Sequence, residues 1–122
     1  MAYSISECTS AIQSNSRLSK IVDTELRLVN DQHHPMLLKA AGCLYLDGFL
    51  DMTCLVAGGA NTRRERRNFI ALRRDLAVTQ LREAGIIPAM PLMFSIAWFV
   101  FKWVILQFIQ NLLDRYSDPE ET

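Results

Sequence analysis

Residues 86–101 read IIPAMPLMFSIAWFVF, and none of these side chains carries a charge. Lys102 interrupts the run, and WVIL then resumes it. The span from Ile86 to Val104 is 19 residues long, close to the roughly 20 that a helix needs to cross the hydrocarbon core of a bilayer. Its aliphatic and phenylalanine side chains favour insertion by roughly 3–5 kcal/mol. The stretch therefore predicts a C-terminal transmembrane helix over about 86–113, whose last part lies at the membrane interface.

The far end of this segment has the features of a membrane boundary. A lysine near the end of a span extends its ammonium group to the interface, and Trp103 suits the aromatic belt at that depth. Beyond this point the residues form two faces. The apolar face consists of Ile105, Phe108, Ile109 and Leu112, and the polar face of Gln107, Gln110, Asn111 and Asp114. We expect this amphipathic part to lie at the interface or against a neighbouring helix; the alternative is a long helix buried in a soluble oligomer.

The sequence before this segment predicts an all-α fold. Ser4 and Glu7 match a capping box that opens a short helix over about 5–13. A second helix is expected over 17–29, because apolar residues recur there at steps of three and four. The apolar residues of that helix are Leu18, Ile21, Val22, Leu26 and Val29.

A helical hairpin is expected next, formed by helices over about 36–57 and 62–84. Pro35 suits the start of the first helix, and Gly58-Gly59 ends it. Thr62 and Glu65 match a capping box for the second, and Gly85 suits a left-handed C-cap. We interpret 36–57 as a core helix, since its aspartates make insertion unfavourable, with a partner-assisted second span as the alternative. In the second helix Phe69, Leu72, Leu76 and Ala77 are expected to form the apolar stripe.

The charge distribution predicts an orientation in the membrane. The chain has 13 basic and 13 acidic residues, a balance that argues against a nucleic-acid partner. Seven of the basic residues lie between Arg63 and Arg82, whereas the tail 114–122 is mainly acidic. The positive-inside rule then places residues 1–85 in the cytosol as a helical domain and the C-terminus across the membrane, as in a tail-anchored protein.

The arginine-rich segment is the first candidate site. A glycine turn, a helix start and several guanidinium groups together suit an anion, and the nearest anions at a bilayer are lipid phosphates. The candidate residues for binding anionic lipid are Arg63, Arg64, Arg66, Arg67, Arg73 and Arg74. The alternative is a solvated basic helix that only sets topology.

Polar residues in apolar segments form the second candidate site, one for assembly with other membrane subunits or with further copies of the chain. These residues are Asp47, Asp51, Lys102, Gln107, Gln110 and Asn111. The spacing of Asp47 and Asp51 also suits a divalent metal, although pairing with Lys39 or an arginine is the favoured interpretation. The three cysteines are expected to be reduced and buried, and the sequence contains no recognisable catalytic, metal or cofactor motif.

These observations favour a non-enzymatic, membrane-anchored subunit that oligomerises or docks onto a larger membrane complex, at a bilayer with anionic headgroups. One alternative is a pore or channel-like oligomer, including the kind made by viruses, with Lys102, Ser95 and Gln110 facing the lumen. Another is a lipid-modifying enzyme that uses Asp47 and Asp51.

Overall fold

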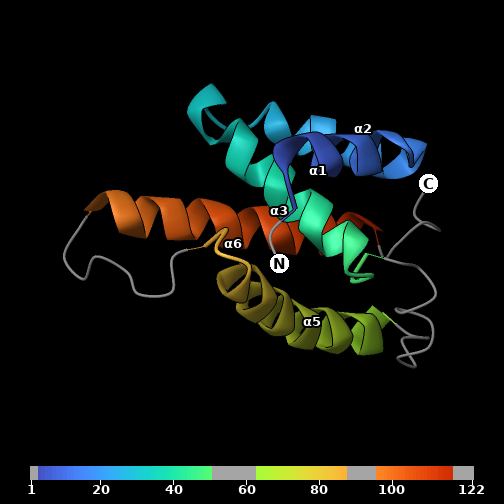
Figure 1. Cartoon of the computed structure of the whole chain (residues 1–122). Helices are drawn as coiled ribbons and strands as arrows, with labels where there is room; N and C mark the ends of the chain where they lie inside the picture. The colour runs from blue at the N-terminus through green and yellow to red at the C-terminus, as the bar shows by residue number, and fades with distance from the viewer. Residues whose placement is uncertain (1–2, 51–62, 88–95, 117–122) are drawn as a thin grey trace.

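The computed structural model describes residues 3–50, 63–87 and 96–116. Its helices are α1 (Ile5–Gln13), α2 (Ser16–Leu26), the 3-10 helix η1 (Asp31–His33), α3 (His34–Leu46), α5 (Arg63–Glu83) and α6 (Ile96–Tyr116). No strand occurs in these ranges, so the expected all-α class is confirmed for them. In Figure 1, α6 runs through the middle of the molecule, between α5 on one side and α1–α3 on the other.

The first two helices begin where side chains cap free backbone N–H groups. The Ser4 hydroxyl accepts from the N–H of Glu7, and the Glu7 carboxylate accepts from the N–H of Ser4, both at 3.0 Å. The expected capping box is thus confirmed, and α1 has the expected bounds. Asn15 caps α2 by accepting from the N–H of Leu18 at 2.9 Å. This helix ends at Leu26, three residues earlier than expected.

Helix α3 ends well before the expected residue 57, and the reason is a glycine. Gly48 has a left-handed φ of 84°, and its N–H donates to the carbonyl of Tyr45 at 3.0 Å. The N–H of Phe49 donates to the carbonyl of Leu44 at 2.8 Å. These two bonds form a Schellman motif, which stops a helix by satisfying its last carbonyls. The expected helix over 36–57 is therefore interrupted after Leu46, where Asp47 is the C-cap residue, and its part over 51–57 lies outside the described residues.

The expected pairing of this helix with the arginine-rich helix is also wrong in its main contacts. Helix α3 packs chiefly against α1, whereas α5 packs chiefly against α6. Within α5 the core-facing residues are Ile70, Ala77 and Leu81. Leu72 and Leu76, which were expected in the apolar stripe, are 72% and 41% exposed. The predicted apolar stripe shares Ala77 with the buried face of α5, but Leu72 and Leu76 lie on a part of the helix surface that is rotated away from the core.

Helix α5 ends in a second Schellman motif, which confirms the expected C-cap at Gly85. Gly85 has a φ of 79° and donates to the carbonyl of Arg82, and Ile86 donates to that of Leu81. Ile86 and Leu81 are both buried in the same core, as expected for the two apolar positions of this motif. Ile87 is buried as well. The first two residues of the expected transmembrane helix thus complete the end of α5.

The structure does not support the expected transmembrane helix over about 86–113. Helix α6 begins at Ile96, and residues 88–95 of the expected span lie outside the described residues. No helix in the described ranges combines the length and apolar character that a membrane crossing needs. Instead the second half of α6 enters the core. Its buried residues are Ile105, Phe108, Ile109, Leu112, Leu113 and Tyr116, which confirms the expected apolar face.

The C-terminal end of α6 is held by the start of α2. The Arg17 guanidinium donates to the carbonyl oxygens of Arg115, at 3.1 Å, and of Tyr116. It also lies over the Tyr116 ring, 4.7 Å from the centroid, while Asn15 contacts the Tyr116 hydroxyl at 3.3 Å. A cation at a helix C-terminus interacts favourably with the unpaired carbonyls and the helix dipole.

Helices α1 and α3 make their closest approach at Gly42. A Cβ atom placed on Gly42 would lie 2.2 Å from Cys8 Cβ and 2.6 Å from Cys8 Cα. Because the second contact is to backbone, no side-chain rotation relieves it. The packing of α1 on α3 therefore depends on the absence of a side chain at this position.

We predict that Gly42→Ala destabilises the protein by about 1–3 kcal/mol, the usual range for overpacking. Helix propensity alone predicts the opposite sign, a gain of about 0.5–1 kcal/mol for this substitution within a helix. Chemical denaturation followed by circular dichroism measures the change. A stabilised Gly42→Ala variant would contradict the close packing of α1 on α3.

Candidate functional site

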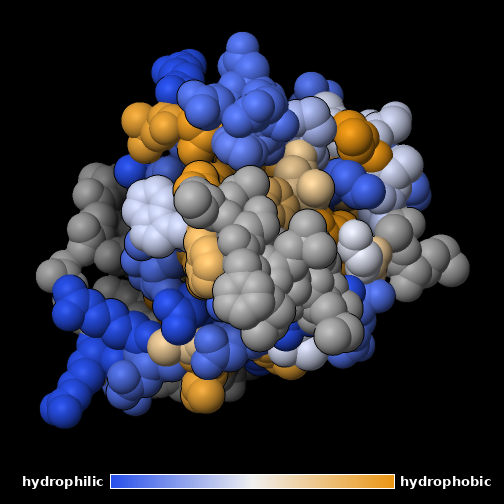
Figure 2. Space-filling view, turned by 90° about the vertical axis from the view of Figure 1, so that its left-hand side faces the viewer, coloured by the Kyte–Doolittle hydropathy of each residue, from blue (hydrophilic) through white to orange (hydrophobic). Residues whose placement is uncertain are grey.

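The first half of α6 presents large apolar side chains to the outside. Phe99 is 58% exposed, Val100 52% and Trp103 63%, and the charged Lys102 between them is exposed as well. The first half of α6, which belongs to the segment expected to cross the membrane, thus places these side chains outside the core. Figure 2 views the molecule from this side and shows hydrophobic residues reaching the surface among hydrophilic ones. We call Phe99, Val100 and Trp103 the α6 apolar patch.

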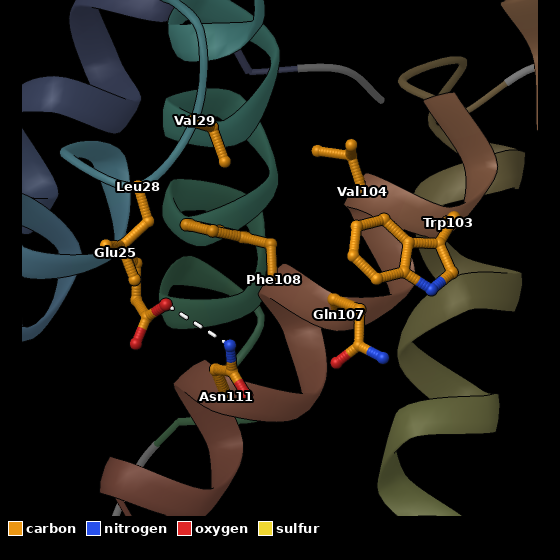
Figure 3. A pocket seen from close by; sticks show the side chains of 8 residues that line it. All are labelled: Glu25, Leu28, Val29, Trp103, Val104, Gln107, Phe108 and Asn111. Atoms are coloured by element: carbon orange, nitrogen blue, oxygen red, sulfur yellow. Dashed lines mark hydrogen bonds between the residues drawn. The ribbon is translucent and has the colours of Figure 1, made fainter. Parts of the chain in front are cut away.

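A groove beside this patch separates α6 from the end of α2, and its volume is about 340 Å³. Trp103 lies at its edge on α6, and Leu28, which is 70% exposed, lies at its edge on the α2 side (Figure 3). The residues that line it are Glu25, Leu28, Val29, Trp103, Val104, Gln107, Phe108 and Asn111. We call this the α2–α6 groove.

A buried carboxylate lies among the lining residues of the groove. Glu25 is only 3% exposed, and its Oε2 accepts from the side-chain amide of Asn111 at 3.2 Å (Figure 3). Arg115 Nε lies 3.0 Å from Glu25 Oε1. This is an ion pair without hydrogen-bond geometry, because Oε1 accepts no hydrogen bond from the described residues. Burial of a carboxylate costs free energy unless the group is paired. The ion pair with Arg115 and the hydrogen bond from Asn111 offset the cost of burying Glu25.

The residues expected to serve assembly lie in several environments. Gln110 accepts from Arg74 Nη1 at 3.2 Å, which joins α6 to α5, and Asn111 joins α6 to α2. Gln107 lines the groove, and Lys102 is exposed. Asp47 accepts from the Tyr3 hydroxyl at 3.1 Å, and this bond raises the pKa of Tyr3. Asp51, the second aspartate of the predicted pair, lies outside the described residues.

The arginines of α5 divide into exposed and structural groups. Arg64 and Arg67 are exposed, whereas Arg73 lies over the rings of Phe69 and Phe49, 4.9 and 5.9 Å from their centroids. Arg74 bonds Gln110 and pairs with Asp75 at 3.5 Å. Arg63 and Arg66 belong to α5, but their side chains are not among those that the structure describes. Arg64 and Arg67 are therefore the described candidates for an external anion.

Two of the three cysteines are buried as free thiols, as expected, and Cys54 lies outside the described residues. Cys8 lies against Cys43, and its thiol contacts the carbonyl of Lys39 at 3.6 Å. Burial raises the pKa of Cys8 to about 11, and it also raises that of Cys43. Both therefore stay protonated and unreactive near neutral pH.

The described residues contain no cluster of three histidine, cysteine or acidic side chains suited to a metal.

The sequence interpretation missed Glu25, although its periodicity carries a signal. Glu25 follows Leu18 and Val22 at helical spacing, so it occupies the core-facing side of α2. A charged residue in a core-facing position needs a partner. That partner is more than 80 residues away in the sequence, where local patterns give no information about it.

The chain matches no protein-family model, no curated protein and no solved structure. Its function is therefore inferred from the residues and their geometry.

We predict that Arg115→Gln destabilises the protein by about 1–3 kcal/mol. The substitution leaves the Glu25 carboxylate buried without its counter-charge, and the cost is below that of a fully buried pair because Arg115 is 48% exposed. Adding Glu25→Gln should recover part of the loss, since both charges are then gone. Arg82→Gln, on the exposed side of α5, is the control and should change stability by less than about 0.5 kcal/mol. Equal effects of the two single variants would show that the ion pair contributes little.

Proposed function

We propose that this chain is a non-enzymatic subunit that attaches to an anionic membrane surface through the first half of α6 and docks there onto a larger membrane complex. The observation that carries the proposal is the α6 apolar patch. Phe99, Val100 and Trp103 are each more than half exposed on a helix whose second half is buried in the core. Adjacent large apolar side chains exposed in this way indicate a surface that contacts lipid or protein.

Lipid is the favoured contact because of the residue types. Tryptophan is enriched at the membrane interface, and phenylalanine is typical of the apolar face of helices that lie in it. A neighbouring lysine can extend toward the headgroups. Each large apolar side chain contributes about 1.5–3 kcal/mol when it leaves water completely, and partial burial contributes less. Arg64 and Arg67 lie near the start of α5, which is at the opposite end of the molecule from the start of α6 (Figure 1). They therefore add less than the roughly 1 kcal/mol that a basic residue contributes when it lies directly at an anionic surface.

Attachment to the surface agrees better with the packing than a complete crossing does. Ile86, before the undescribed stretch 88–95, and Ile105, in the second half of α6, are both buried in one core. A continuous span over 86–104 would place its two ends on opposite sides of about 30 Å of hydrocarbon. A helix that spans the bilayer over these residues would require this core to open. Attachment to the membrane surface is therefore the main proposal, and a membrane-spanning helix is its alternative.

Vesicle binding of the full-length protein tests the patch. We expect Phe99→Gln with Trp103→Gln to weaken co-sedimentation with anionic liposomes about tenfold or more, because the lost apolar burial exceeds about 1.4 kcal/mol. The matched control is Leu72→Gln with Leu76→Gln, which removes two exposed leucines from α5 and should leave binding unchanged. Equal losses in both variants, or no binding by the wild type, would refute the proposed contact.

Further measurements separate the alternatives. Extraction of cellular membranes with alkaline carbonate should release the protein, whereas retention would favour the spanning form. Replacement of Arg64 and Arg67 by glutamine should weaken binding to anionic vesicles less than the loss of Phe99 and Trp103 does, with no change on neutral vesicles. Dye leakage from the same vesicles would instead favour a pore, and metal-dependent lipid turnover would favour an enzyme.

A further inference from the structure

The α2–α6 groove has an apolar part and a polar edge. The apolar part, called the apolar wall below, consists of Leu28 and Val29 from the turn after α2 and of Val104 and Phe108 opposite them on α6 (Figure 3). The polar edge follows α6 in steps of one turn, from the Trp103 indole to the amides of Gln107 and Asn111. Residues four apart lie above one another on a helix, so these three line one edge. A ligand here meets apolar and aromatic surface on one side and hydrogen-bonding groups on the other.

The charges at the groove restrict the ligand further. Glu25 lines the groove, and Arg115 Nε lies 3.0 Å from its Oε1, so these two opposite charges largely cancel. An anionic or a cationic ligand therefore finds no unpaired opposite charge among the lining residues to offset its loss of hydration. Neutral hydrogen-bonding groups suit the side-chain amides of Gln107 and Asn111, which contain both donors and acceptors.

We infer that the α2–α6 groove binds a small, neutral aromatic molecule that carries a hydroxyl group. The ring lies between Trp103 and Leu28 against the apolar wall, and the hydroxyl group faces Gln107 and Asn111. The volume of about 340 Å³ is at the lower end of the range for small-molecule sites, which suits one ring with a short substituent. Edge-to-face or offset packing against Trp103 and Phe108 favours an aromatic ring over an aliphatic chain. The inference does not depend on membrane attachment, because its test contains no lipid.

The indole N–H of Trp103 reports binding directly. The chain has two tryptophans, so Trp98→Phe leaves one indole signal in the proton NMR spectrum of the full-length protein. The probes are para-propylphenol, para-propylanisole, which lacks the hydroxyl donor, and para-propylbenzoate, which is an anion. We expect a saturable shift with the phenol, and binding about fivefold or more weaker with the ether and the benzoate. Equal affinity for all three, or no saturation with the phenol, would overturn the inference.

A matched pair of variants locates the bound molecule. Leu28 is 70% exposed at the groove and Leu72 is 72% exposed on α5, so neither replacement by alanine disturbs the core. In the Trp98→Phe background, Leu28→Ala should weaken phenol binding about threefold or more, because it removes part of the apolar wall. Leu72→Ala should leave the binding curve unchanged. Equal weakening by the two variants, or none by Leu28→Ala, would place the probe elsewhere and reject the groove as its site.

Discussion

The buried face of α6 is the contact on which the rest of the described structure depends. Ile105, Ile109, Leu112 and Leu113 are at most 1% exposed and lie in the same core as residues of α2, α3 and α5. Each contributes roughly 1.5–3 kcal/mol to folding, so together they match the net stability of a typical small domain. The segment that most resembles a membrane anchor thus supplies much of the interior.

The same apolar side chains suit a bilayer and a protein core. Sequence analysis therefore described the individual helices better than their arrangement. The capping box at Ser4, the C-cap at Gly85 and the two faces of α6 beyond Val104 are local patterns, and the structure confirms each of them. The end of α3 was missed because Gly48 was judged to lie within a helix, although its left-handed backbone closes a Schellman motif. Hydropathy does not distinguish lipid from a protein core, since both accept the same side chains.

The candidate site was predictable only in part, for the same reason. The unusual apolar content at Phe99 and Trp103 is visible in the sequence, and so is the charge of the arginine-rich helix. The groove is different, because one side comes from the end of α2 with the turn after it and the other from α6, which are far apart in the sequence. The amides assigned to assembly were identified as polar residues on one face, but Gln110 and Asn111 contact Arg74 and Glu25 of the same chain. Long-range pairing decides which polar groups remain available for a partner.

The contact between Gly42 and Cys8 has a consequence for how this protein can change over time. The two backbones are so close that the positions share one small volume, and a side chain at either position occupies space that the other needs. Residue 42 cannot gain a side chain through a change at residue 8 alone, because even a glycine there would leave its Cα 2.6 Å from the new Cβ. Relatives of this chain should therefore keep glycine at position 42 as long as α1 packs here, whereas position 8 can take another small side chain.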